Sequence, residues 1–203
     1  MREDRSARGN ARLSRPSSED ARGDRWIQAL ALPVAMAVVE SASAGTHAAS
    51  RAGLIQLRAP GLGGRELERE ATVLVASSPV PVIVSSRCDV ALAAGAAGVN
   101  LPERDIPVAA ARALLGDRLV GRSVHSVQGA LEAEREGADF VIFGPVWSSA
   151  SHPDTAPAGL RALTAVAAAV RIPVVAIGGV TEARIAECRS AGAAGYAAIS
   201  LFR

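Results

Sequence analysis

The sequence predicts a compact (β/α)8 barrel of the TIM-barrel type, an α/β fold. From Trp26 onward, short runs rich in β-branched residues alternate with Ala-rich segments of helical composition. Runs this short and this apolar are typical of parallel strands that are buried on both faces. The alternation also contains an internal repeat, and a strand-and-helix unit copied around the chain indicates a closed barrel.

The predicted strands follow one another at short intervals. The Ala-rich segments between them favour amphipathic helices. We expect eight strands, at Val34–Val39, Leu54–Leu57, Val82–Val84, Gly98–Leu101, Leu119–Arg122, Phe140–Phe143, Val174–Ile177 and Tyr196–Ile199.

The repeat is visible in the residues that precede every second strand. The chain reads RAGLIQL, AAGAAGVNL, REGADFVIF and SAGAAGYAAIS there, with glycines 42, 42 and 55 residues apart. Glycine after the last helical turn adopts a left-handed conformation at no steric cost and ends the helix. The glycines are Gly53, Gly95, Gly137 and Gly192, and three of the other strands follow Pro33, Pro81 and Pro173.

A doubly wound open sheet shares this alternation and is the alternative fold. Such a sheet usually has about five or six strands and a Gly-rich first turn, whereas the first predicted strand here ends in VVESASAG, without a GxGxxG motif. The barrel departs from the usual pattern after its last strand, because Ser200 to Arg203 follow directly and the eighth helix is missing. We expect the Trp26–Leu32 segment, or a second subunit of a homo-oligomer, to cover that gap.

Charge and composition divide the chain in two. Residues 1–25 are rich in Arg, Ser and Gly, with seven Arg against five acidic residues, and we expect a disordered extension. Residues 26–203 form a single domain in this prediction, with 15 basic against 15 acidic residues. Aromatic residues make up 3% of the chain, so the basic stripe and stacking rings of nucleic-acid binders are both missing.

Several absences exclude further classes of protein. No uninterrupted apolar run approaches the ~20 residues of a membrane span, and the N-terminus has no apolar signal stretch. The two cysteines, Cys88 and Cys188, lack metal spacing, so we expect buried thiols in a cytoplasmic protein. All 22 residues of the Lys+Arg count are Arg, which rules out a Walker-A phosphate loop and lysine Schiff-base chemistry.

Barrel active sites lie at the carboxyl ends of the strands, so the residues that follow each predicted strand are candidates. Gly178 and Gly179 follow the seventh strand, and Ser200 follows the eighth. Loops at these two positions bind phosphate in many barrels, through glycine amides. The alternative is a tight turn that merely requires glycine. We expect a phosphate site here.

Other strand ends carry histidine, glutamine and arginine. His125 follows the fifth strand in VGRSVHSVQG, before the N-cap candidate Ser126, where an imidazole can exchange protons near neutral pH. Gln56 and Arg58 lie two residues apart, so both point from the second strand into the barrel mouth. An Arg fork there suits a phosphate or carboxylate, with a surface ion pair as the alternative.

Weaker signals come from four more residues. His152 lies in a long Gly/Pro/Ser-rich loop that is typical of a mobile lid, although an exposed loop histidine is the favoured interpretation. His47 lies on a predicted outer helix and should face solvent. Glu103 and Asp105 follow the fourth strand, and a carboxylate pair of this kind is weak evidence for a metal site.

These residues resemble the thiamine phosphate synthase / TenI family of barrels from Val34 to Ser200. The resemblance rests on IQLR at 55–58, VIVSSRCDVALAAGAAGVNLPE at 82–103, VGRSVHS at 120–126, GADFVIFGPV at 137–146, and PVVAIGGV with AGAAGYAAIS within 173–200. It implies a phosphorylated thiazole as the small-molecule partner, held after the last two strands by Gly178, Gly179, Ile199 and Ser200.

Departures from the synthase pattern determine which branch of the family we predict for this chain. Synthases of the family carry QxRxK for the pyrimidine pyrophosphate, and Pro60 stands at the Lys position. They carry Asn-Asp after the third strand, the Asp binding magnesium, where this chain reads SS at 85–86; a second metal Asp is retained as Asp105. They carry TxTK after the sixth strand, where this chain reads SASH at 149–152. Each loss removes charge-assisted contacts worth about 1.5–3 kcal/mol.

The resemblance therefore favours the TenI branch, and with it an isomerase. GRSVHS, which contains Arg122 and Ser123, is similar to that branch, and His125 matches the proposed acid/base of its thiazole tautomerases. The implied reaction is a proton transfer on a thiazole carboxylate phosphate, with Arg58 or Arg122 facing the carboxylate and no metal or other cofactor. Synthase activity is doubtful in this interpretation.

Two alternatives stay open. The first is a true synthase that joins the thiazole phosphate to the pyrimidine pyrophosphate, with magnesium as its cofactor. The second is a degenerate barrel that binds a phosphorylated ligand without turnover, which the missing eighth helix and the diverged loop at 149–152 suggest.

Overall fold

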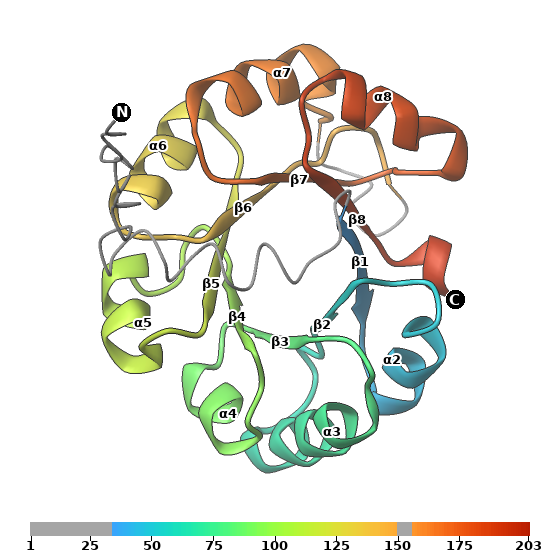
Figure 1. Ribbon diagram of the computed structural model, residues 1–203, viewed down its shortest axis with the longest axis vertical. Helices are drawn as coiled ribbons and strands as arrows, with labels where there is room; N and C mark the ends of the chain where they lie inside the picture. Colours follow the sequence, from blue (N-terminus) through green and yellow to red (C-terminus); the bar gives the residue numbers. More distant parts are fainter. Residues whose placement is uncertain (1–33, 150–155) are drawn as a thin grey trace, which may run out of the picture.

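Eight parallel strands close into a barrel in chain order, with β1 hydrogen-bonded to both β2 and β8 (Figure 1). This computed structural model describes residues 34–149 and 156–203. It confirms the predicted (β/α)8 fold. The strands are β1 (Val34–Val39), β2 (Leu54–Leu57), β3 (Val82–Ser85), β4 (Gly98–Leu101), β5 (Leu119–Val124), β6 (Phe140–Phe143), β7 (Val174–Ile177) and β8 (Gly195–Ala198).

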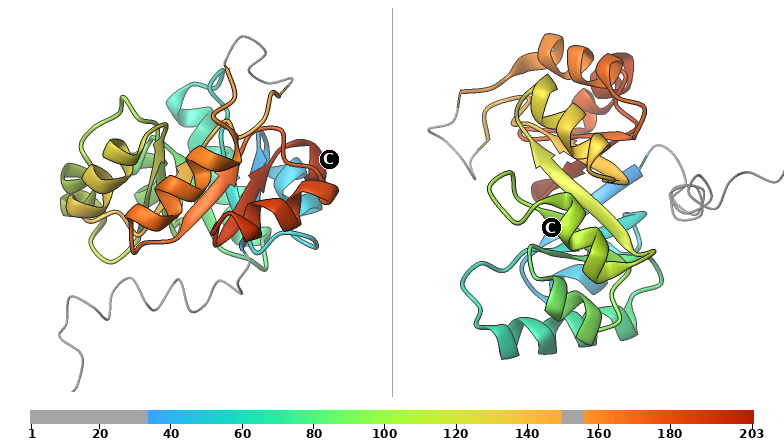
Figure 2. Two further views of the ribbon diagram at one scale, coloured as in Figure 1. Left: turned by 90° about the horizontal axis from the view of Figure 1, so that it is seen from above. Right: turned by 90° about the vertical axis from the view of Figure 1, so that its left-hand side faces the viewer.

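Helices surround the strands, and the side views of Figure 2 show them on the outside of the barrel. One helix follows each of β1 to β7. The helices are α2 (Ala42–Ala48), α3 (Gly64–Ser77), α4 (Cys88–Ala93), α5 (Val108–Leu115), α6 (Val127–Arg135), α7 (Gly159–Ala169) and α8 (Ile185–Ser190), with the 3-10 turns η1 (Glu182–Arg184) and η2 (Ser200–Phe202).

The bounds of three strands differ from the prediction by one or two residues. Strand β3 continues to Ser85, and β5 continues to Val124 because its last two residues remain paired with β6. Strand β8 begins at Gly195 and ends at Ala198, so Ile199 lies just after it. Longer ladders at β3 and β5 carry polar residues farther into the barrel mouth than the sequence suggested.

Side chains alternate between the barrel interior and the layer under the helices, as a period of two requires. In β1, Met36 and Val38 belong to the interior cluster, and Ala37 and Val39 pack under the helices. Near the start of β5 and β6 the interior is closely filled, because a Cβ on Gly121 would lie 2.2 Å from the Phe140 ring. Apolar packing thus fills the barrel toward the amino ends of the strands.

Three of the four repeated glycines end helices as predicted. Gly95, Gly137 and Gly192 have φ angles of +69°, +92° and +90°, in the left-handed region. Gly53 is different, and the expectation of a helix stop there is wrong. It lies outside the set of positive-φ glycines, and its N–H donates to the Ala35 carbonyl at 2.9 Å, so it begins the β2 ladder instead.

Beside β8 and β1, where the sequence analysis expected a gap, the described residues contain no eighth helix. In Figure 1 the short turn η2 occupies this place, between α8 and α2. Phe202 of η2 is 5% exposed, and its ring stacks with Tyr196 of β8 at a centroid distance of 6.4 Å. The Trp26–Leu32 segment that we expected here, and the extension at residues 1–25, lie outside the described residues.

An ion-pair network closes the barrel at the amino ends of β5 and β6. Arg112 of α5 donates to Asp139 at 2.5 Å and to the carbonyls of Arg118 and Gly137 at 2.6 and 3.0 Å. The same Asp139 oxygen accepts the Val120 N–H at 2.7 Å. Because both charged groups are largely buried and well partnered, this network holds α5 against the barrel.

The two cysteines are buried free thiols, as predicted. Burial raises the pKa of the Cys188 thiol above its usual value, so it stays protonated at neutral pH. Within the described ranges, the helices are all too short or too polar to cross a membrane.

Candidate functional site

A cavity of about 680 Å³ opens at the carboxyl ends of the strands. Every strand or the loop after it contributes to the lining. Eight of the nine predicted ligand-facing or catalytic residues meet in it: Gln56, Arg58, Ser123, His125, Gly178, Gly179, Ile199 and Ser200. The structure therefore gathers residues that are up to 144 positions apart in the chain around one space.

Polar side chains from β2 to β5 form one side of the cavity. Gln56 and Asn100 are the buried polar residues of the described chain, at 3% and 2% exposure. The Asn100 Nδ2 donates to Ser123 Oγ at 3.0 Å, whereas its Oδ1 has no partner among the described residues. The sequence analysis missed Asn100 because it considered residues after the strands; the available signal was a polar residue two positions after Gly98 inside an apolar run.

His125 is held in one orientation at the rim. Its Nδ1 lies 2.5 Å from the Gly144 carbonyl oxygen, which can only accept, so Nδ1 carries the proton and donates it. Its Nε2 lies 3.9 Å from the Glu103 carboxylate, whose other oxygen accepts the His125 backbone N–H at 3.3 Å. Ser126 caps α6 as predicted, accepting the Gly129 N–H at 3.1 Å. The free nitrogen of the ring is thus available for proton exchange.

The Gly178–Gly179 turn has a backbone that other residues cannot adopt without strain. Both φ angles are positive, at +94° and +65°. A Cβ on Gly178 would lie 2.5 Å from the Pro145 side chain, and one on Gly179 would lie 2.5 Å from the Ser148 carbonyl. The Gly178 carbonyl of this turn also accepts a hydrogen bond from the Trp147 N–H at 3.0 Å. Glycine is therefore required at both positions of this turn, and both residues line the cavity at the place where the sequence predicts a phosphate site.

Arg122 lies apart from the other predicted residues. It is absent from the cavity lining, and its guanidinium donates to the Ile106 and Glu103 carbonyls at 2.9 and 3.0 Å. Its side chain therefore braces the loop after β4, which carries Glu103 into the cavity. The sequence placed Arg122 correctly on β5 but could not tell that its side chain turns away from the mouth.

Three arginines line the cavity, against one carboxylate, Glu103. Arg58 extends from the end of β2, as predicted, and is exposed. The other two, Arg184 and Arg203, were not predicted. Arg184 lies five residues after Gly179 and returns to the mouth through η1, a path that strand-end reasoning does not reveal.

The residues assigned to magnesium by the family pattern do not fit a divalent cation here. Ser86 donates its hydroxyl hydrogen to Asp105 Oδ2, and the Ile106 N–H donates to Asp105 Oδ1 at 2.7 Å. Both oxygens of the single carboxylate are therefore engaged, and neither Ser86 nor Asp105 lines the cavity. Among the described residues, no three His, Cys, Asp or Glu side chains converge as metal ligands would.

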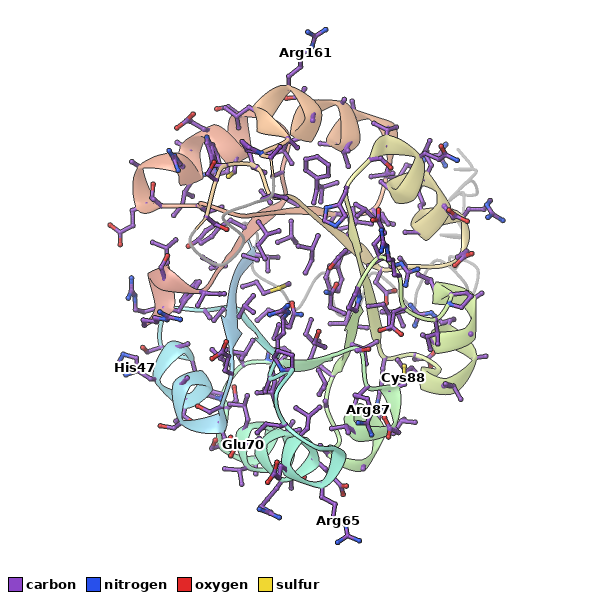
Figure 3. All side chains as sticks on the ribbon, turned by 180° about the vertical axis from the view of Figure 1, so that it is seen from behind. His47, Arg65, Glu70, Arg87, Cys88 and Arg161 are labelled. Carbon is purple, nitrogen blue, oxygen red and sulfur yellow. The ribbon has the colours of Figure 1, made fainter. Side chains whose placement is uncertain are left out.

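Pro60 and Ser149, two positions where the chain departs from the synthase pattern, differ in their relation to the cavity. Pro60 is exposed after β2 and does not line the cavity, whereas Ser149 lines it. His152 lies outside the described residues. His47 is exposed on α2 at the periphery of the molecule, as expected (Figure 3).

A second hollow of about 370 Å³ lies on the outer surface between α3 and α4, near Arg65 and Arg87 in Figure 3. The Arg87 guanidinium forms a bidentate ion pair with Asp89, at 2.5 and 2.8 Å. Its lining carries two arginines and two carboxylates, Arg65, Arg87, Glu68 and Asp89, so its charges balance, unlike those of the barrel mouth.

The chain belongs to the thiamine monophosphate synthase family, whose pattern it matches over residues 34–202. It is 42% identical over 168 residues to the thiamine-phosphate synthase of Chloroflexus aurantiacus, covering 81% of this chain and 76% of that one. It is 44% identical over 158 residues to the thiamine-phosphate synthase of Methanoculleus marisnigri, covering 75% of each chain.

Solved structures agree with the family. The thiamine phosphate pyrophosphorylase of Pyrococcus furiosus superposes with a TM-score of 0.74 at 32% identity, covering 82% of this chain and 84% of that one. A 3-hexulose-6-phosphate synthase superposes with a TM-score of 0.64 at 21% identity, covering 82% and 90%, and shares the fold.

These relatives correct the expected activity. The sequence analysis favoured an isomerase and doubted synthase activity, whereas relatives at 40–44% identity are named thiamine-phosphate synthases. The error came from the weight given to Pro60, Ser86 and His152. Pro60 and Ser86 lie outside the cavity lining, so these two substitutions do not define the cavity, and His152 lies outside the described residues.

Proposed function

We propose that this member of the thiamine monophosphate synthase family joins a thiazole phosphate to a pyrimidine pyrophosphate, forming thiamine phosphate. The observation that carries the proposal is that one cavity of about 680 Å³ is lined by two groups whose chemistry suits anions. One is the Gly178–Gly179 turn after β7, and the other is Arg58 at the end of β2. A reaction between two phosphorylated molecules needs both.

The two substrates divide the cavity in this proposal. Gly178, Gly179 and Ser200 bind the thiazole phosphate, and Ile199 provides an apolar contact beside it. Gln56 and Ser123 form hydrogen bonds to the heterocycles, because these side chains lie on the polar side of the mouth. Arg58 binds the pyrophosphate through its guanidinium fork.

Joining the substrates forms a bond from a thiazole nitrogen to a pyrimidine-borne carbon and breaks the bond from that carbon to the pyrophosphate oxygen. The pyrophosphate departs with the electron pair of the broken bond. His125 can hold a proton at Nε2 for the leaving oxygen, because its Nδ1–H is already committed to the Gly144 carbonyl. Glu103 lies 3.9 Å from Nε2 and accepts the His125 backbone N–H, so it helps to hold the ring in place. Holding the reacting atoms together supplies much of the rate gain.

The experiment is to incubate the purified full chain with both substrates in buffer containing magnesium and to measure thiamine phosphate by chromatography. We expect product that requires both substrates, with an at least about 10-fold lower rate for Arg58→Met. Arg161→Met, on the exposed surface of α7, is the matched control and should leave the rate unchanged. Binding of thiazole phosphate without any product would contradict the proposal and favour a ligand-binding barrel.

A further inference from the structure

Arg184 is an arginine of the cavity that neither the strand-end pattern nor the proposed reaction uses. Arg184 is the last residue of η1, the short turn after β7, and it lines the same cavity as Gly178 and Gly179. We propose that Arg184 is a phosphate-binding residue, whose guanidinium binds the phosphoryl group of a substrate seated on the Gly178–Gly179 turn. The identity of that substrate as a thiazole phosphate rests on the proposed function.

Two contacts from different loops fix the guanidinium in place. Its Nη1 donates to the Gly179 carbonyl at 2.7 Å, and its Cζ lies 4.9 Å from the centroid of the Trp147 ring. The Trp147 N–H in turn donates a hydrogen bond to the Gly178 carbonyl of the same turn, at 3.0 Å. A planar guanidinium that is stacked and hydrogen-bonded loses little freedom when it binds an oxyanion, so it is preorganised for one.

The charge of Arg184 is unbalanced within the described residues. No carboxylate there lies within ion-pair distance of it, and its neighbour Glu182 lies 3.6 Å from Arg51 instead. Arg184 is half-buried, and charged side chains that leave bulk water are normally paired. Of its five N–H donors, the described residues engage one, at the Gly179 carbonyl. The remaining donors and the unpaired charge indicate an anionic ligand.

The position of Arg184 matches the turn that would hold the anion. No side chain separates the guanidinium from the turn, because Gly178 and Gly179 have none, and both line the same cavity. A phosphoryl group on the turn amides is then within reach of the free edge of the guanidinium, and Arg binds such groups through two parallel hydrogen bonds. Since the chain has no lysine, arginine is the side chain that can supply a permanent charge here.

The test is calorimetric binding to wild type, Arg184→Met, Arg184→Lys and the control Arg161→Met. The ligands are the thiazole phosphate, the same thiazole without phosphate, inorganic phosphate and pyrophosphate. For Arg184→Met we expect the Kd of the thiazole phosphate to rise about 10- to 100-fold. The Kd of the uncharged thiazole should change less than about twofold, and Arg184→Lys should recover part of the loss because it keeps the charge.

Three outcomes would overturn the proposal. Equal weakening of the charged and uncharged thiazole would mean that Arg184 only supports the turn. Weakening confined to pyrophosphate would assign the residue to the other substrate, and an unchanged Kd would remove it from binding. The two proposals also fail separately: wild type that binds thiazole phosphate through Arg184 but forms no product contradicts the synthase reaction alone.

Discussion

The two ends of the barrel use polar side chains differently. At the amino ends of β5 and β6, Arg112 and Asp139 bind each other and the surrounding backbone, and one carboxylate oxygen serves two donors. At the carboxyl ends, Asn100 Oδ1 has no partner among the described residues, and Arg184 has no described acidic partner. The Arg112–Asp139 network is internally hydrogen-bonded, although the Nε of the adjacent Arg118 has no partner among the described residues, whereas the other end leaves groups unpaired around a cavity.

This difference separates stability from binding. A buried polar group that is partnered supports the fold, and removing its partner leaves a desolvation cost uncompensated. A buried polar group without a partner costs the fold stability in the absence of ligand, and that cost is recovered when a ligand supplies the partner. Substitutions at the amino ends should therefore change stability, and substitutions at the carboxyl ends should change turnover.

The largest effect is expected from Gly179→Ala. A methyl group at φ +65° and 2.5 Å from the Ser148 carbonyl must shift the turn, and displacing a binding group by about 1 Å can cost about 100-fold in rate. We expect kcat/KM for thiamine phosphate formation to fall by about 100-fold.

Gly95→Ala is the matched control for that prediction. Gly95 has a similar φ of +69°, but nothing lies within 4 Å of its Cβ position, and it ends a helix at the amino side of β4. Both variants should lose about 1–2 kcal/mol of unfolding free energy from the left-handed backbone. If Gly95→Ala lost as much activity as Gly179→Ala, the separation of the two ends would be refuted.

Arg112→Met should have the largest effect at the amino ends of the strands. It leaves Asp139 largely buried without its cation, and we expect the free energy of unfolding to fall by about 3 kcal/mol in urea denaturation. The kcat of the folded protein should stay unchanged. Arg135→Met removes an exposed pair with Glu132 and should cost less than about 1 kcal/mol. A drop in kcat for Arg112→Met would show that the network also supports the site.

Asn100→Leu should have the opposite effect to Arg112→Met, lowering activity while leaving stability nearly unchanged. The unpaired Oδ1 offers the fold nothing, and the loss of the Ser123 hydrogen bond is offset by apolar contacts, so unfolding free energy should change by less than about 1 kcal/mol. We expect kcat/KM to fall about 10-fold because the polar side chain that positions Ser123 beside the cavity is gone. Ser123→Ala, which removes the other partner, should have a similar effect on rate. Normal turnover in both variants would mean that this pair is purely structural.

The smallest effect on stability is expected from the ion pair between Arg87 and Asp89 on the outer surface. The hydrogen bond from Arg87 lowers the pKa of Asp89 to about 2, from its usual 3.8. This pair therefore stabilises the protein above about pH 4, and the contribution is lost as the pH falls toward 2. Both side chains are exposed, so the contribution should stay below about 1 kcal/mol. Urea denaturation at pH 6 and pH 3 should show a smaller loss of stability for Arg87→Gln than for wild type; equal losses would contradict the assignment.

The sequence by itself determined the strands, the barrel and the position of the Gly178–Gly179 turn after β7. Their signals are local: a period of two places Gln56 inward, and three repeated glycines take the left-handed conformation that ends a helix. Even so, the same local pattern misjudged Gly53, because the ladder with β1, not the helix before it, sets its backbone.

Only the tertiary structure decided which side chains act together. Arg122 turns to the loop after β4, Ser86 bonds to Asp105, and Arg184 stacks on Trp147 from another loop. Each of these contacts joins a strand or loop to the loop after a neighbouring strand. Barrel closure sets the distances between such segments, and neither helix nor strand periodicity contains that information. The family could therefore be identified from the order of residues, whereas the use of each charged side chain depended on the closed barrel.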